Sequence, residues 1–408
     1  MRKAQMRSPA IAPISCDVDE STSSSAAKLF AMKAPLKQIA LAFPMGVSHL
    51  ERVAFGIHRY AQEQGDWLLV SNPERHHLSL SDLKGWQGDG LVAFLTNAEE
   101  VALAQELKLP LVNLSGALAD TAFPRVRMDY DAMGRLAAEH FLKRGFSHFA
   151  YYGVLDLWYA AEIGRGFAEA LAAEGFELHR HDSPSALDPR SHWIQDGSAF
   201  AAWLQALPRP CALLCAQDQR GVHAVHTCFR SGLRVPQDIA VLGCNNDGIS
   251  CEMLSPTLSS VARAGDDLGY AAARLLHQLM QGIQAPATDL VFPPGKVIER
   301  DSTATLVLDD PELQKAVAYI RANIAASLNV ASICTHLGRS RRWLEYAFRK
   351  ELDCTPLDFI LQSRVQAAAR MLRQQPKAKL GAIASNCGFS SPAQMQRAFK
   401  KMGGGTKE

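Results

Sequence analysis

Two sets of polar side chains, about fifty residues apart, recur at the spacing of one helical face. The first set is Arg341, Arg342, Glu345 and Arg349, and the second is Gln394, Arg397, Lys400 and Lys401. Arg can form paired hydrogen bonds with guanine and Gln with adenine, whereas other basic side chains commonly bind phosphate oxygens. Carried on exposed helices, these sets would therefore recognise double-stranded DNA.

Each set accompanies an apolar pair four residues apart, which is Leu344 with Phe348 and Met395 with Phe399. Residues four apart share a helical face, so we predict that each pair is buried and that each polar set faces outward. By this phase, the residues expected to face base edges are Arg342, Glu345, Gln394 and Arg397. Those expected to meet phosphates are Arg341, Arg349, Lys400 and Lys401.

The residues around each set predict a helix–turn–helix. Each copy has an Ile in a short helix, then a Gly that can take a left-handed turn, then a Ser that can cap a second helix. These residues are Ile333, Gly338 and Ser340 in one copy and Ile383, Gly388 and Ser391 in the other. Two ordinary helical hairpins are the alternative, but a basic outer face on both favours recognition helices.

The charge distribution supports a nucleic-acid module at the C-terminal end. Residues 312–408 contain 16 Lys and Arg against 6 Asp and Glu, a net charge of +10. The other 311 residues contain 27 and 35, a net charge of −8. A basic quarter joined to an acidic body indicates a DNA-binding part attached to something else.

Composition excludes several classes of protein. No apolar run is long enough to cross a bilayer, and the N-terminus lacks the apolar region of a secretory signal. The nine cysteines form no CxxC pair, so we expect reduced thiols in a cytoplasmic protein. Membrane association is not expected.

Residues 37–303 alternate short apolar strands with helices of 10–16 residues, which predicts an α/β fold of doubly wound parallel sheets. This length exceeds one comfortable core, so we expect two lobes with a ligand between them, at the carboxyl ends of the strands. We expect residues 1–36 to be a disordered leader, although an over-early start codon explains them equally well.

An all-α domain is expected to follow a linker at 304–311. It should span 312–408, starting from a helix capped by Asp310 with Pro311 at its first position. A long helix at 356–374, capped by Thr355, should separate the two helix–turn–helix units. To read successive major-groove faces, the two recognition helices must lie about one helical turn of DNA, roughly 34 Å, apart.

Two families are similar to the two parts of the chain. Residues 330–408 resemble the AraC/XylS DNA-binding domain, through Ser340, Leu344 and Phe348, Thr355-Pro356, Arg364, Gly388-Phe389 and the run Arg397-Ala398-Phe399-Lys400. Residues 37–303 resemble the LacI/GalR type of periplasmic-binding-protein-like domain, through the runs Gly88-Asp89-Gly90, Arg165-Gly166-Phe167, Ala216-Gln217-Asp218 and Glu299-Arg300-Asp301-Ser302-Thr303.

This combination, in this order, resembles activators of the xylose-operon type. The resemblance implies a sugar-responsive activator that binds an operator in double-stranded DNA, with D-xylose as the leading effector. It also implies a homodimer and contact with RNA polymerase. A sensor of another sugar with the same architecture remains the alternative.

Sugar hydroxyls in a dry site need polar partners, because an unpaired buried polar group costs about 1–3 kcal/mol. Charged groups give the strongest hydrogen bonds, and an aromatic ring can cover the apolar face of a sugar. The candidates that match the family pattern at strand ends or helix starts are Arg52, Asp129, Trp158, Arg165, Asp218 and Asn245.

Most of these candidates have a plain structural alternative. Asp129 and Asp218 could simply be helix N-caps with no role in binding. Trp158 could be a core residue, and Arg165 could pair with acidic residues on the surface. Relatives usually carry Asp where this chain has Asn245, so either Asn246 and Asp247 take over its role or the ligand differs.

An enzyme and an exported solute-binding protein are the rival classes. The sequence has no GxSxG nucleophile elbow, no P-loop and no HExxH metal motif, and His76-His77 lies in a loop without further ligands at metal-site spacing. We therefore predict no catalytic residue, no cofactor and no metal. The basic C-terminal module and the missing signal peptide argue against an exported protein.

Overall fold

Short apolar runs form the first sheet, which belongs to the N-terminal lobe. The computed structural model describes residues 36–72, 74–120, 122–184, 197–308, 310–326, 328–375 and 377–402; the predicted leader lies outside these residues except for Leu36. The sheet is parallel, in the order β2-β1-β3-β4. Its strands are β1 (Lys37–Ala42), β2 (Trp67–Val70), β3 (Gly90–Ala93) and β4 (Leu111–Asn113).

Three helices cover this sheet: α2 (Ser48–Gln64), α3 (Ala98–Leu107) and α9 (Gly265–Met280). Helices α2 and α9 approach closely because each has a glycine at the crossing. A Cβ on Gly56 would lie 2.0 Å from the Asp266 carbonyl oxygen, and one on Gly269 would lie 2.0 Å from that of Val53.

The C-terminal lobe contains a six-stranded sheet in the order β12-β10-β9-β8-β6-β7. All neighbours are parallel except β12, which runs antiparallel to β10. The strands are β6 (Phe149–Val154), β7 (Leu178–Ser183), β8 (Cys211–Cys215), β9 (Ile239–Asn245), β10 (Ser259–Ala262) and β12 (Val297–Ile298). Strands β7 and β10 and the short helix α8 (Gly248–Glu252) are not predicted by the sequence pattern.

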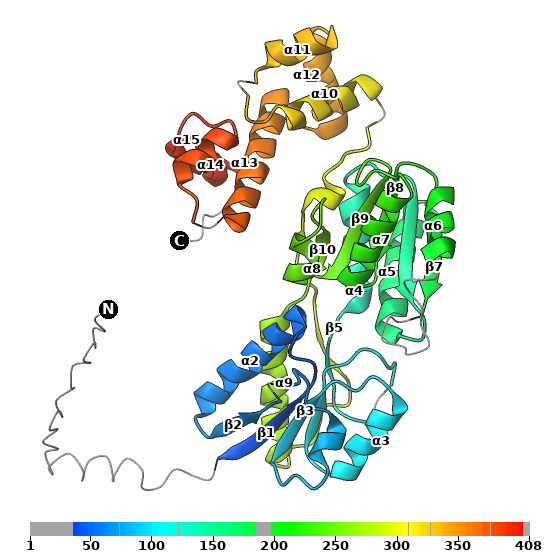
Figure 1. The fold of residues 1–408 in the computed structure, drawn as a ribbon, viewed down its shortest axis with the longest axis vertical. Coiled ribbons are helices and arrows are strands. Elements are labelled where there is room, and N and C mark those ends of the chain that lie inside the picture. The colour runs from blue at the N-terminus through cyan, green and yellow to red at the C-terminus, as the bar shows by residue number, and fades with distance from the viewer. Residues whose placement is uncertain are drawn as a thin grey trace, which may run out of the picture.

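The remaining helices of this lobe are α4 (Tyr130–Leu142), α5 (Trp158–Ala173), α6 (Gly197–Ala206) and α7 (Asp218–Arg230). Helices α4 and α5 repeat the glycine-mediated approach of α2 and α9. A Cβ on Gly134 would lie 2.1 Å from the Ile163 carbonyl oxygen, and one on Gly166 would lie 2.2 Å from that of Asp131. Each lobe thus contains one closely packed helix pair (Figure 1).

Within the described residues, the chain crosses between the lobes three times. The crossings follow β5 (Val126–Met128), β10 and β11 (Leu290–Phe292). Hydrogen bonds join the three segments: Asp129 N donates to the Phe292 carbonyl at 2.7 Å, and Gly295 N donates to the Ala262 carbonyl at 2.9 Å. Any movement of one lobe against the other must therefore involve all three segments together.

A helical domain follows the two lobes and stands apart from their sheets (Figure 1). It begins with α10 (Pro311–Ala322), whose predicted cap Asp310 is confirmed. The other helices are α11 (Val330–Leu337), α12 (Arg341–Leu352), α13 (Pro356–Gln374), α14 (Leu380–Asn386) and α15 (Pro392–Lys401). Among the described residues, no helix is long and apolar enough to cross a membrane.

Helix α13 joins two small cores. Phe359 and Ile360, near its start, pack with α10, α11 and α12, whereas Ala368 packs with α14 and α15. Arg364, between them, donates to the Ile324 and Ala326 carbonyls at 3.3 and 2.8 Å, which fixes the loop after α10 against α13. The bounds and the Thr355 cap predicted for this helix are confirmed.

Candidate nucleic-acid interface and inter-lobe site

The two predicted helix–turn–helix units form as their local signals require. Gly338 and Gly388 both have left-handed backbones, with φ of 64° and 75°. The Ser340 side chain accepts a hydrogen bond from Trp343 N, and that of Ser391 accepts one from Gln394 N. These caps start α12 and α15 at the predicted residues.

The predicted burial of the second helices is also confirmed. Leu344, Phe348 and Met395 are at most 2% exposed, and Phe399 is 8% exposed. Each apolar pair therefore fixes the rotation of its helix about the helix axis. The opposite faces remain available to a partner.

The polar face of α12 is exposed and mostly basic. Arg341, Arg342 and Arg349 are exposed, and Glu345 is half-buried. The Arg341 Nε atom lies 2.8 Å from Glu345 Oε1, so these two residues pair along the face. Tyr346, which is not among the residues predicted for this face, is 66% exposed. Its spacing of four residues from Arg342 was the signal that could have identified it.

The polar face of α15 carries Gln394, Arg397, Lys400 and Lys401, all of them exposed. The Gln394 side-chain oxygen accepts from Ser390 N at 2.7 Å and from Ser390 Oγ at 2.9 Å. A paired contact with adenine needs this oxygen, so Gln394 would have to exchange those bonds on DNA. Lys401 Nζ lies 3.5 Å from Asp358 Oδ1 of α13.

The second candidate site lies where the two lobes meet. Ser48, at the start of α2, donates to Asp247 Oδ1 at 2.7 Å across the lobes. Asp247, after β9, also accepts from Gln219 Nε2 at 3.3 Å and from Ser250 Oγ at 3.0 Å. Its carboxylate therefore connects the start of α2 in the N-terminal lobe with α7 and α8 in the C-terminal lobe.

Aromatic side chains form the neighbouring side. Tyr130, Trp158 and Tyr159 lie together, with ring centroids of Tyr130 5.9 Å from Trp158 and 5.8 Å from Tyr159. The Arg263 guanidinium lies 5.9 Å from the Tyr130 ring and donates to Asn245 Oδ1 at 3.2 Å. Gln217 Nε2 donates to the Tyr159 hydroxyl.

Backbone contacts close the lobes over these aromatic residues. Trp158 N and Tyr159 N each donate at 2.9 Å to carbonyls of the opposite lobe, those of Ala117 and Gly116. We call the set of residues that meets here the inter-lobe site: Ser48, His49, Tyr130, Trp158, Tyr159, Gln217, Gln219, Asn245, Asp247 and Arg263. It combines carboxylate, amide, guanidinium and ring groups, which can hydrogen-bond hydroxyls and cover a C–H face.

Burial shifts the pKa of His49, which belongs to this site, and of Asp218, which lies directly behind it. Burial, together with the Arg263 charge, lowers the pKa of His49 well below its usual value, so its ring is neutral. Within the described part of the chain, the buried His49 Nδ1 atom has no hydrogen-bond partner. Burial raises the pKa of Asp218 to about 7.

Comparisons with known proteins match both parts of the chain. A family model described as a periplasmic-binding-protein-like domain matches residues 138–303, and one described as a helix–turn–helix domain matches residues 333–406. The xylose operon regulatory protein of Haemophilus influenzae is 27% identical over 373 residues, covering 89% of this chain and 95% of that protein. Its counterpart in Escherichia coli K12 is 28% identical over 374 residues, covering 89% and 94%.

A solved structure extends the similarity to the arrangement of both domains. The structure of the xylose-binding transcription activator XylR has a TM-score of 0.67 and 26% identity, and the match covers 92% of this chain and 97% of that one. This chain is a DNA-binding transcription regulator. It is a regulator with a periplasmic-binding-protein-like sensor, not an enzyme, and the architecture predicted from its sequence is confirmed.

The regulator brings only some of the predicted sugar-binding residues together. Trp158 and Asn245 belong to the inter-lobe site. Asp129 precedes Tyr130 and accepts from Ala132 N at 2.9 Å, so it caps α4 as the plain alternative proposed. Asp218 is fully buried behind the site, where it accepts from Asp247 N at 2.7 Å and Ser260 Oγ at 2.6 Å. It supports Asp247 and is not the N-cap of its helix, which is Gln217.

Arg52 and Arg165 lie outside the inter-lobe site as defined by these contacts. Arg165 pairs with Glu162 at 2.9 Å, Glu169 at 3.0 Å and Asp131 at 3.0 Å, which matches the alternative of a surface pair. Arg52 is exposed and pairs with Asp266 of α9 at 3.2 Å.

Trp158 does not stand open toward the site. The guanidinium groups of Arg125 and Arg127 each lie 4.9 Å from the centre of its ring. Both arginines bond the same Asp289 oxygen at 2.6 Å. The ring is thus held by a charged cluster that belongs to the N-terminal lobe, and it forms part of the contact between the lobes.

Proposed function

We propose that the chain is a sugar-responsive activator of pentose catabolic genes, with D-xylose as the effector. Similarity over nearly the whole chain to xylose operon regulatory proteins supports the effector class. The inter-lobe site supports a polyhydroxylated ligand, because its polar groups bond one another across the lobes. The contact that carries the proposal is the bond of 2.7 Å from Ser48 to Asp247, which a sugar hydroxyl can replace on both sides.

The proposed ligand groups come from both lobes. Asp247, Arg263 and Asn245 would bond hydroxyls, and the His49 Nδ1 atom would accept a hydrogen bond from another. Each such partner matters, because a buried hydroxyl left without one costs about 1–3 kcal/mol. A sugar bound by both lobes would favour the closed arrangement, as an effector must if it is to shift the equilibrium.

On DNA, we propose that α12 and α15 enter successive major grooves. Arg342, Glu345, Gln394 and Arg397 would face base edges, and Arg341, Arg349, Lys400 and Lys401 would meet phosphates. The exposure of these faces and the burial of the opposite ones support this orientation. Tyr346 would join the contacts of α12.

The setting of this activity is part of the same proposal. We propose a cytoplasmic homodimer that contacts RNA polymerase, with a sensor at residues 37–303 and a DNA-binding domain at 312–408 joined by the linker 304–311. Sedimentation of the full chain would measure whether it is a dimer. Limited proteolysis at the linker would test the division into domains.

The test is a binding screen with D-xylose, L-arabinose, D-ribose and D-glucose. A ligand that binds only the folded protein raises its melting temperature by mass action, and calorimetry then gives the Kd. We expect D-xylose to bind and to increase affinity for a promoter fragment in a gel shift. Binding of a different pentose alone would replace the effector, and binding of no sugar in the screen would refute the sensor function.

A further inference from the structure

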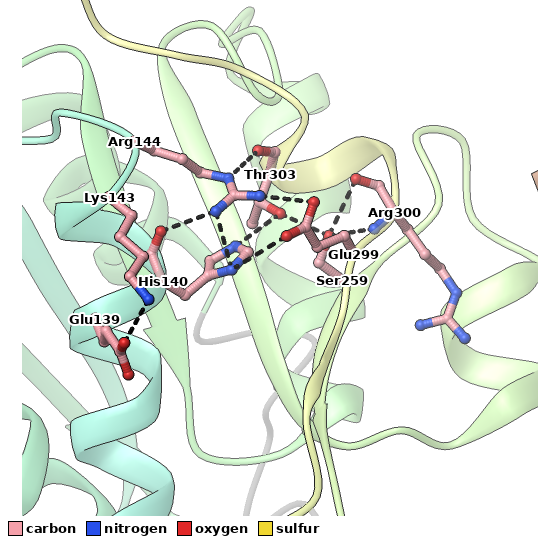
Figure 2. Close-up of polar contacts among 8 residues, drawn as sticks. All are labelled: Glu139, His140, Lys143, Arg144, Ser259, Glu299, Arg300 and Thr303. Carbon is pink, nitrogen blue, oxygen red and sulfur yellow. Dashed lines mark hydrogen bonds and ion pairs between the residues drawn. The ribbon is translucent and has the colours of Figure 1, made fainter. Parts of the chain in front are cut away.

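The linker leaves the C-terminal lobe beside a set of hydrogen-bonded side chains (Figure 2). We call this set the joint; its residues are Thr303, His140, Arg144 and Ser259. Thr303, the last residue of the short 3₁₀ helix Asp301–Thr303, is at its centre. Its carbonyl accepts from Arg144 Nε at 3.2 Å, and its hydroxyl lies 3.1 Å from His140 Nε2 and 2.8 Å from Ser259 Oγ. Both Thr303 and Ser259 are fully buried, and His140 is only 6% exposed.

The chemistry of the joint gives every hydrogen bond a direction. Burial lowers the pKa of His140 to about 3, so the ring is neutral. Arg144 can only donate, and its Nη1 lies 3.1 Å from His140 Nδ1, so the ring proton is on Nε2. Nε2 therefore donates to Thr303, and the Thr303 hydroxyl donates to Ser259. Arg144 is also paired with Glu299 at 2.7 Å.

The joint also holds the chain that leads to the DNA-binding helices. Val307 N donates to the Arg144 carbonyl at 2.8 Å. From the helical domain, Arg321 Nη1 of α10 donates back to the Ala304 carbonyl at 2.7 Å. The end of α4, the linker and α10 are thus connected through a few bonds on either side of Thr303.

The other end of the joint reaches the inter-lobe site through β10. Ser260, next to Ser259, donates to Asp218 Oδ1 at 2.6 Å, and Asp218 Oδ2 accepts from Asp247 N at 2.7 Å. Asp247 in turn accepts from Ser48 of the opposite lobe at 2.7 Å. Strand β10 then continues through Arg263 into one of the three crossings between the lobes. A change at Asp247 is therefore passed to Ser260, and the residue before it in β10, Ser259, bonds Thr303 at the start of the linker.

We propose that this chain of bonds couples the inter-lobe site to the DNA-binding domain, and that Thr303 is its coupling residue. The inference rests on the proposed function, since it assigns the route by which a sugar acts on DNA binding. The coupling chain consists of Ser48, Asp247, Asp218, Ser260, Ser259 and Thr303. Ligand between the lobes alters the Ser48–Asp247 contact, and the buried bonds transmit that change to the position of the linker.

Thr303→Val is the sharpest perturbation, because it keeps the shape of the side chain and removes the hydroxyl that links His140 to Ser259. The experiment uses the full chain and a duplex that the wild-type protein selects from a randomised pool. The Kd for this duplex is measured with and without saturating D-xylose, and the ratio is the coupling factor. Calorimetry measures the Kd for D-xylose without DNA.

We expect a coupling factor of about tenfold in the wild-type chain and at most about twofold in Thr303→Val, within the usual range of allosteric effects. The Kd for D-xylose without DNA should change less than about threefold. Thr303→Ser keeps the hydroxyl and should keep the factor. Glu139→Gln is the matched control. Glu139 lies on α4 next to His140, but its side chain pairs with Lys143 on the surface at 2.5 Å (Figure 2).

A folded Thr303→Val chain that binds D-xylose and retains the wild-type factor would overturn the proposal. If that variant does not fold, Ser260→Ala breaks the same chain one step nearer the site and should show the same loss; a retained factor there has the same meaning. A wild-type factor near one with every pentose would instead refute the proposed function, and the coupling assignment would fall with it.

Discussion

The buried carboxyl of Asp218 should make stability depend on pH in a way that one substitution removes. Burial raises its pKa from 3.8 to about 7, so the folded protein binds this proton more tightly than the unfolded chain does. Stability from this group is therefore greatest below the unfolded pKa and is lost as pH rises toward 7. Each pH unit well inside that interval lowers the free energy of unfolding by about 1.4 kcal/mol, and the loss levels off near the folded pKa, so the rise from pH 5 to pH 8 accounts for about 3 kcal/mol.

Asp218→Asn should abolish this dependence with little change of shape. The amide oxygen can accept from Asp247 N, and the amide NH₂ can donate to Ser260 Oγ, whose hydroxyl is free to rotate. The free energy of unfolding of the variant, relative to wild type, should therefore rise by about 3 kcal/mol between pH 5 and pH 8.

Urea unfolding of the full chain, followed by tryptophan fluorescence at several pH values, measures this difference when the m-values agree. Asp267→Asn is the control, because the Asp267 side chain is 73% exposed and its difference from wild type should stay constant. Parallel pH profiles for Asp218→Asn and wild type would show that Asp218 is ionised throughout and would refute the reasoning.

Three further predictions concern DNA, ligand and fold. Arg397→Ala should relax base preference at one position by about 1–3 kcal/mol, whereas Lys401→Ala should weaken all sequences alike; identical profiles against a randomised duplex library would mean that the assigned face of α15 is wrong. Ser48→Ala should weaken D-xylose binding about fivefold in calorimetry, which is about 1 kcal/mol for one hydrogen bond; an unchanged Kd would exclude it as a ligand group. Gly388→Ala should lower the melting temperature more than Gly338→Ala, because only at Gly388 would a Cβ meet a backbone carbonyl, at 2.2 Å; equal shifts would contradict this.

The helical domain could be predicted from the sequence because its signals are local. Capping serines, a left-handed glycine and an apolar pair four residues apart all act within one or two turns, so bounds and faces followed directly. Strand β7 could not be found in this way. Its residues, Leu178–Ser183, are mostly polar, and it forms at the edge of the sheet by pairing with β6.

The inter-lobe site was harder to predict because its residues are distant in sequence. Ser48 and Asp247 are separated by 199 positions, and no local pattern joins them. Asn245 was predicted for this site, and its neighbour Asp247, considered as a substitute, is the residue that bonds across the lobes. Arg165 pairs with the Glu residues three before and four after it on the same helix, and these local partners hold its side chain outside the contacts of the inter-lobe site.

The single helix between the two reading units has a consequence for promoters. With 19 residues at about 1.5 Å each, α13 is roughly 28 Å long, and it is anchored in a separate core near each end. A helix anchored in this way cannot lengthen when the two DNA segments bound by α12 and α15, the half-elements, are moved apart. One base pair inserted in the gap between the half-elements also rotates the second one by about 36° around the duplex. A promoter read by this protein should therefore tolerate base changes within a half-element far better than a single-base change in the gap between them.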